Sequence, residues 1–90
     1  GKLTQDVNAS FAQTTKAAQS ALLALKLEII KETTSQGIVQ IRSRYIDGEN
    51  IWIDVRRITE TTSRIEVRVG TVKSNKEEAS KILKRIEQCL

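Results

Sequence analysis

One stretch decides the fold: residues 38–70, which read IVQIRSRYIDGENIWIDVRRITETTSRIEVRVG. Apolar and polar residues alternate within it in three successive runs, at 38–46, 51–56 and 64–69. Side chains of a β-strand point alternately to opposite faces, so this two-residue period indicates strands with one buried and one solvent-exposed face. The tight turn Asp47-Gly48-Glu49 and a threonine-rich loop separate the runs. The stretch therefore predicts an antiparallel sheet with a single buried face.

The segment upstream of this sheet is helical in pattern. Residues 9–25 repeat apolar side chains at the 3.6-residue period of an amphipathic helix, and many of them are alanines. Ser10 and Gln13 have the spacing of a capping box, in which each side chain bonds the other residue's free backbone N–H. Weaker alternation predicts short strands at 3–7 and 27–32, the second followed by a turn at 33–37.

A second helix follows the last strand, which Gly70 closes. Ser74 or Asn75 is the expected N-cap, and Ser74 with Glu77 repeats the capping-box spacing. The apolar stripe of this helix consists of Ala79, Ile82, Leu83, Ile86 and Leu90. The two helices are expected to cover the one apolar face of the sheet together.

The sequence thus predicts a single α+β domain over residues 1–90, in the order β-α-β-β-β-β-α. The architecture is a two-layer sandwich, with an antiparallel sheet of four to five strands and both helices on one face. The length of 90 residues suits one domain and the apolar share of 39% suits a globular one. We expect a monomer.

Composition excludes several classes of chemistry. The chain has no histidine and one cysteine, so a disulfide within the chain, a Cys/His zinc site and a Ser-His-Asp triad are all impossible. The eleven carboxylates are interleaved with lysine and arginine and do not indicate a paired acid–base site. We expect no catalytic residue, no metal and no cofactor. Cys89 is expected to be a partly buried small hydrophobe, with a reactive thiol or an intermolecular disulfide as alternatives.

Two binding surfaces follow from the pattern. A slim, alanine-rich helix over an aliphatic sheet leaves room for an apolar cavity, for which a close-packed interior is the alternative. The candidate lining residues are Tyr45, Leu22, Ile41, Ile53 and Val67.

The wet face of the sheet is the second candidate. It is expected to carry more basic than acidic groups, and it holds the only tryptophan of a chain whose net charge is +4. Such a face is typical of modules that bind nucleic acid or another polyanion. The simpler alternative is cross-strand ion pairing of arginines with Asp54 and Glu66. The candidate polyanion residues are Arg42, Arg44, Trp52, Arg56 and Arg68.

Several segments resemble one known family. They are the helix at 11–25 with Ala18, Ala21 and Leu22, the strand start Gly37-Ile38-Val39-Gln40, and the helix end Ile82-Leu83 … Ile86 … Leu90. The most specific is 62–70, TSRIEVRVG, which is similar to a T-x-I-x-I-R-V-G signature. On these residues the chain resembles small bacterial cell-envelope lipoproteins classed as a domain of unknown function, which include virulence-associated lipoproteins of Francisella.

The resemblance implies a location rather than a reaction. Members of this family are lipoproteins anchored to the outer membrane through a cysteine that precedes the folded domain, and the resemblance implies the same for this chain. It implies a non-enzymatic envelope domain that contributes to virulence and binds an envelope protein or a small apolar ligand. Binding of nucleic acid or another polyanion is the alternative function, and nucleic acid is the less favoured partner.

Overall fold

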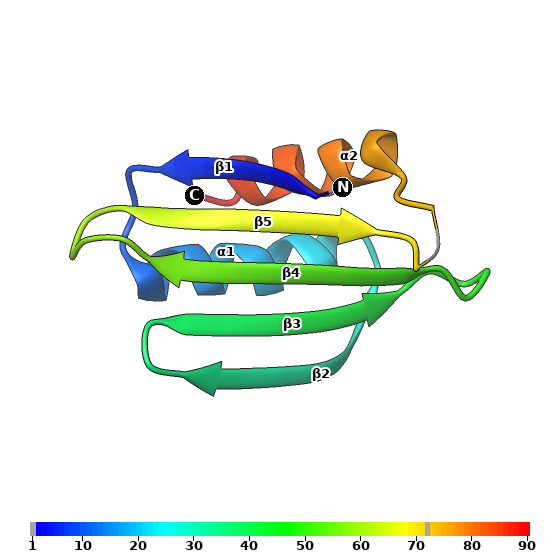
Figure 1. Ribbon diagram of the computed structural model, residues 1–90, viewed down its shortest axis with the longest axis horizontal. Helices are drawn as coiled ribbons and strands as arrows, with labels where there is room; N and C mark the ends of the chain where they lie inside the picture. The colour runs from blue at the N-terminus through cyan, green and yellow to red at the C-terminus, as the bar shows by residue number, and fades with distance from the viewer. Residues whose placement is uncertain (1, 72) are drawn as a thin grey trace.

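The computed structural model describes residues 2–71 and 73–90. Its elements follow one another as β1 (Leu3–Val7), α1 (Phe11–Ala24), β2 (Glu28–Ser35), β3 (Ile38–Arg44), β4 (Asn50–Arg57), β5 (Ser63–Val69) and α2 (Lys76–Gln88). The predicted order and the predicted α+β two-layer sandwich are confirmed. Both helices lie on one side of the sheet, and the other side is open to solvent (Figure 1). Neither helix is long and apolar enough to cross a bilayer.

The sheet is antiparallel throughout, with spatial order β1-β5-β4-β3-β2. Alternation in the three central strands matches their burial, because every second residue of β3, β4 and β5 is buried against the helices. The core consists of the aliphatic residues among these together with Ala17, Ala18, Ala21 and Leu22 of α1 and Ala79, Ile82, Leu83 and Ile86 of α2. Leu90, expected in the apolar stripe of α2, lies beyond the helix and is exposed. The small α1 residues let that helix lie close to the sheet.

The two helix starts differ in their caps. At α1 the predicted capping box is confirmed: the Ser10 hydroxyl accepts from the backbone N–H of Gln13, and the Gln13 side chain accepts from that of Ser10. At α2 the second of the two expected caps, Asn75, is confirmed, so the helix begins one residue later than a Ser74 cap would place it. Asn75 is the N-cap, and its side-chain oxygen accepts from the backbone N–H of Glu78 at 3.1 Å.

The end of α1 uses a residue other than glycine in a left-handed conformation. Lys26 has φ +60°, and the N–H of Leu27 reaches back to the carbonyl of Leu22 at 2.8 Å. This is the hydrogen bond of a Schellman motif, which satisfies a carbonyl that the helix itself leaves free. It turns the chain sharply from α1 into β2.

The second strand differs from its prediction. β2 runs to Ser35, so Thr33–Ser35, expected in the turn, pair with β3 and leave only Gln36 and Gly37 to connect the strands. Every residue of β2 is exposed, because the helices do not extend over this edge of the sheet (Figure 1). A register shift between Ile29 and Lys31 marks a β-bulge near its start.

Gly70 makes the turn from β5 to α2 possible. Its φ is +94°, and a Cβ added there would collide with the backbone carbonyl oxygen of Lys73. The tight connection is held by the N–H of Asn75, which donates to the carbonyl of Val69 at 2.7 Å.

We therefore expect Gly70→Ala to lower the free energy of unfolding by about 2 kcal/mol or more, since it adds a backbone collision to an unfavourable φ. Gly48→Ala is the matched control: Gly48 has φ +91° with open space around its Cβ position, so it isolates the conformational cost of about 1 kcal/mol. Urea unfolding followed by circular dichroism measures both. Equal losses in the two variants would contradict the collision.

Candidate functional site

An open groove lies at the end of the sandwich where the turn after α1, the β3–β4 loop and the first turns of α2 meet. Its volume is about 710 Å³. The groove is lined by Leu25, Lys26, Leu27, Tyr45, Ile46, Asp47, Glu49, Asn75, Glu78, Lys81 and Ile82. Three segments far apart in the sequence build it, and the Schellman turn after α1 places Leu25 and Leu27 in its wall.

The walls of the groove are apolar. Leu25 and Leu27 are partly buried and pack on the core, and Ile82 of α2, which also lines the groove, is fully buried. Ile46 lies at the rim, with a relative exposure of 107%, the highest among the large apolar residues that the structure describes. A fully exposed isoleucine beside an apolar wall is the kind of surface that a ligand covers.

Tyr45 provides a polar group inside this apolar surround. Its hydroxyl donates a hydrogen bond to a carboxylate oxygen of Glu78 at 3.0 Å. Burial raises the pKa of Tyr45 far above its usual value, and the hydrogen bond to Glu78 and the charges of Glu78, Glu49 and Asp47 raise it further. Tyr45 is therefore a neutral hydrogen-bonding group at every physiological pH.

The rim carries more acidic than basic groups. Asp47, Glu49 and Glu78 face Lys26 and Lys81, and the Lys81 ammonium lies 3.3 Å from the other carboxylate oxygen of Glu78. Glu78 is thus engaged on both oxygens. It holds Tyr45 in place from α2, so the tyrosine joins the two layers of the sandwich at the mouth of the groove.

The structure separates the residues proposed for the apolar cavity. Leu22, Ile41, Ile53 and Val67 are at most 1% exposed and lie in the core between helices and sheet. Tyr45 alone contributes to the groove. Sequence reasoning missed the other groove residues because they come from loops and helix ends, where no periodic pattern marks them. The exposed isoleucine at position 46, next to the Asp47-Gly48 turn, is the one signal that was available.

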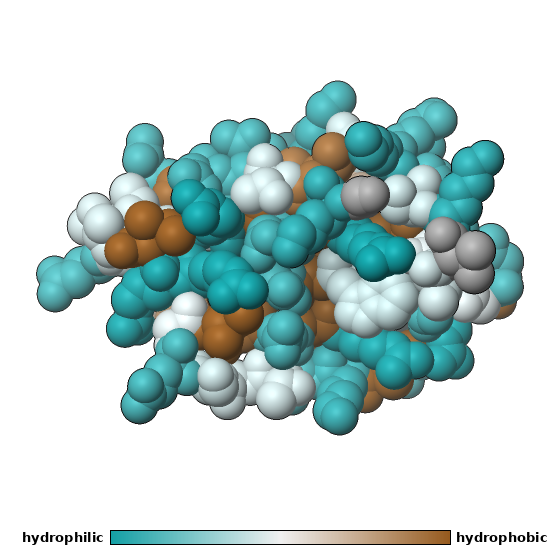
Figure 2. Space-filling view, viewed as in Figure 1, coloured by the Kyte–Doolittle hydropathy of each residue, from teal (hydrophilic) through white to brown (hydrophobic). Residues whose placement is uncertain are grey.

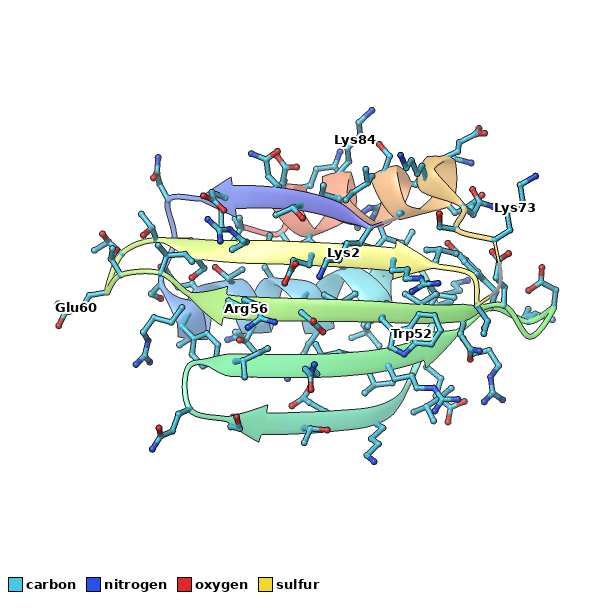
Figure 3. All side chains as sticks on the ribbon, viewed as in Figure 1. Lys2, Trp52, Arg56, Glu60, Lys73 and Lys84 are labelled. Carbon is cyan, nitrogen blue, oxygen red and sulfur yellow. The ribbon has the colours of Figure 1, made fainter. Side chains whose placement is uncertain are left out.

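The open face of the sheet presents the other predicted surface. Arg42, Arg44, Trp52, Arg56 and Arg68 all project from it, and Figure 3 shows Trp52 and Arg56 on the side turned away from the helices. Polar side chains dominate the face (Figure 2). Trp52 is directly opposite Arg42 on one side and Arg68 on the other, and the Arg68 guanidinium lies 5.6 Å from the centre of the Trp52 ring.

Ion pairs occupy one part of this face. Glu66 accepts from Arg56 at 2.9 Å and from Lys2 at 2.8 Å, and Arg64 pairs with Asp6 at 2.7 Å. These contacts hold the pKa of Glu66 and of Asp6 below their usual values. The expected pairing of arginine with Glu66 is confirmed. Across the described ranges 2–71 and 73–90, Asp54 has no ion-pair partner.

Other potential chemistry is sparse. In the described part of the chain, no three His, Cys, Asp or Glu side chains gather into a group that suits a metal ion. The prediction that Cys89 is partly buried is wrong: the thiol is free and exposed, and the residue is the C-cap that follows the last turn of α2.

Comparison with known proteins identifies the family. A family model described as "Protein of unknown function (DUF3568)" matches residues 1–89. The chain belongs to the DUF3568 family. The match covers both helices and all five strands, so the groove and the open face both lie within the DUF3568 region. No curated protein matches the chain. The predicted membership of a family of unknown function is confirmed. That the protein is a lipoprotein remains a prediction.

The pH dependence of stability should report on Glu66. Its pKa is lowered in the folded protein from an ordinary value of 4.5, so its contribution is present above pH 4.5 and is lost as the pH falls through the lowered folded value. We expect Glu66→Gln to cost about 1 kcal/mol at neutral pH and nothing at the acid end. Urea unfolding across this pH range measures the difference. Glu60→Gln, in the exposed β4–β5 loop, is the control and should leave the pH profile unchanged (Figure 3).

Proposed function

We propose that this chain is a non-enzymatic binding domain of the bacterial cell envelope, and that the groove holds a small apolar ligand. The observation that carries the proposal is the fully exposed Ile46 at the rim of an apolar-walled groove of about 710 Å³. Clefts of about 300–1,000 Å³ with few polar groups are typical of small-molecule sites. The apolar side chains of an envelope protein are the second class of occupant.

A binding role suits the groove better than catalysis. The best-placed carboxylate, Glu78, is held by Tyr45 and Lys81 and is not poised to take a proton from a substrate. The Tyr45 pKa is raised, which keeps this group neutral rather than nucleophilic. In this role Tyr45 and Glu78 fix the polar end of a ligand whose apolar part covers Leu25, Leu27 and Ile46.

The envelope location is a proposal that rests on the signature at residues 62–70 and its likeness to outer-membrane lipoproteins. It places the domain on a lipid anchor and connects it with virulence. The test is the intact mass of the native protein after fractionation of its own cells. We expect membrane-fraction protein with an acyl-glyceryl adduct, whereas unmodified protein in the soluble fraction would refute the lipoprotein assignment.

Ligand binding in the groove is tested with the neutral apolar dye Nile red. We expect Ile46→Asp to weaken dye binding about tenfold or more, because it removes an apolar contact and adds a charge at the rim. Ile58→Asp is the matched control: Ile58 is an exposed isoleucine, 44% accessible, in the loop at the opposite end of the sheet. It should leave dye affinity unchanged.

Equal losses of dye affinity in both variants, or none in either, would refute the groove as the binding site. Neither isoleucine belongs to the buried core, so both variants are expected to fold. Circular dichroism checks this before the titration.

A further inference from the structure

A row of cationic and aromatic side chains crosses the open face of the sheet. Lys31 of β2 pairs with Arg42 of β3, Arg42 pairs with Trp52 of β4, and Trp52 pairs with Arg68 of β5. Directly opposite residues project to the same face of a sheet, so the four side chains stand side by side. With strands about 4.8 Å apart, the row spans about 14 Å.

The positive charge of this row is not neutralised within the protein. Over residues 2–71 and 73–90, neither Lys31 nor Arg42 has an ion-pair or hydrogen-bond partner for its side chain. Arg68 donates only to the backbone carbonyl of Thr71, at 3.0 Å, besides its contact with Trp52. The arginine ion pairs of this face, Arg56 with Glu66 and Arg64 with Asp6, lie further along the strands. Free cationic charge is therefore concentrated around Trp52.

A shallow hollow of about 260 Å³ adjoins the row. It is lined by Lys2, Gln40, Trp52, Asp54, Glu66 and Arg68. Lys2 and Arg56 engage Glu66, but the side chains of Gln40 and Asp54 have no hydrogen-bond partner in the described part of the chain. A planar amide and a free carboxylate beside an aromatic ring suit hydroxyl groups, which donate to the carboxylate and accept from the amide.

We propose that this face binds an anionic saccharide. A sugar ring packs its C–H face on Trp52, because the faces of aromatic rings carry negative charge and those C–H groups are weakly positive. Its hydroxyls bond to Gln40 and Asp54. Its acidic group lies on Arg42 and Lys31, since guanidinium groups form paired, charge-assisted hydrogen bonds with oxyanions. The site is separate from the groove and does not depend on the function proposed there.

The composition of the face favours a saccharide over a single-stranded nucleic acid. Nucleic acids on sheet surfaces stack successive bases on several aromatic side chains, and this face has one. The unpaired carboxylate of Asp54 lies in the hollow with Trp52 and would repel a backbone with a phosphate at every residue, whereas Glu66 is already paired with Lys2 and Arg56. A saccharide with spaced acidic groups avoids that repulsion and uses Asp54 as an acceptor.

The single tryptophan makes the site directly observable. Trp52 is the only one in the chain, so its fluorescence reports on this face alone. The probe is a hyaluronan hexamer, in which glucuronic acid alternates with the uncharged N-acetylglucosamine, and the same hexamer with its carboxylates methyl-esterified is the uncharged counterpart. We expect the acidic hexamer to change Trp52 fluorescence and the ester to bind at least tenfold more weakly.

Variants locate the anion. We expect Arg42→Gln and Lys31→Gln each to weaken binding of the acidic hexamer about fivefold. Lys84→Gln is the matched control, since it removes one positive charge from the exposed surface of α2, on the helix side of the molecule (Figure 3). It should leave the affinity unchanged. We expect Asp54→Asn to keep the contact of the acidic group with Arg42 and Lys31, and to weaken the hydrogen bonds that the sugar hydroxyls make to residue 54.

Four results would overturn the proposal. They are no fluorescence change at millimolar hexamer, equal binding of the ester, an equal loss in Lys84→Gln, and tighter binding of a short oligothymidylate than of the hexamer. The last would assign the face to nucleic acid, and an equal loss in Lys84→Gln would reduce the interaction to net charge. None of these outcomes bears on dye binding in the groove, so the two proposals fail independently.

Discussion

The structure depends on how much of a five-stranded sheet two helices can cover. The alternate apolar side chains of β3, β4 and β5 meet the alanine face of α1 and the stripe of α2, and this contact forms the whole core. The helices end before the β2 edge, so that strand is exposed on both faces. They also stop short of the β3–β4 loop, and the gap between helix ends and loop is the groove. Both exposed features are consequences of incomplete cover.

The sequence predicts those parts of the fold that depend on a repeating pattern. Alternation in β3, β4 and β5 indicated their burial correctly, and the Ser10–Gln13 spacing located the start of α1. The groove was not predictable in this way, because it joins Leu25, Tyr45 and Glu78, which come from three unrelated segments. β2 was predicted too short because Thr33–Ser35 have the composition of a turn. Their strand conformation is set by pairing with β3, which the chain does not encode locally.

The two candidate surfaces lie toward the same end of the molecule. The row through Trp52 is two residues from Asn50, where β4 leaves the loop that carries Tyr45 and Ile46. Figure 1 places this loop at the end where α1 finishes and α2 begins, and the β2–β3 and β4–β5 hairpins lie at the opposite end. The apolar groove faces the helix side and the cationic row faces the open side. One end of a small domain therefore presents two chemically different surfaces to its surroundings.

The exposed second strand also affects the solubility of the protein. An uncovered edge offers unpaired N–H and C=O groups on which a strand of another molecule can assemble. Ile29 and Ile30 are exposed on this strand, and their burial would stabilise such a contact. The bulge between Ile29 and Lys31 interrupts the regular spacing that such assembly needs, and Lys31 adds a charge at the interruption. Lys31 thus has a second effect beyond its place in the row: it discourages edge-to-edge aggregation of the folded protein.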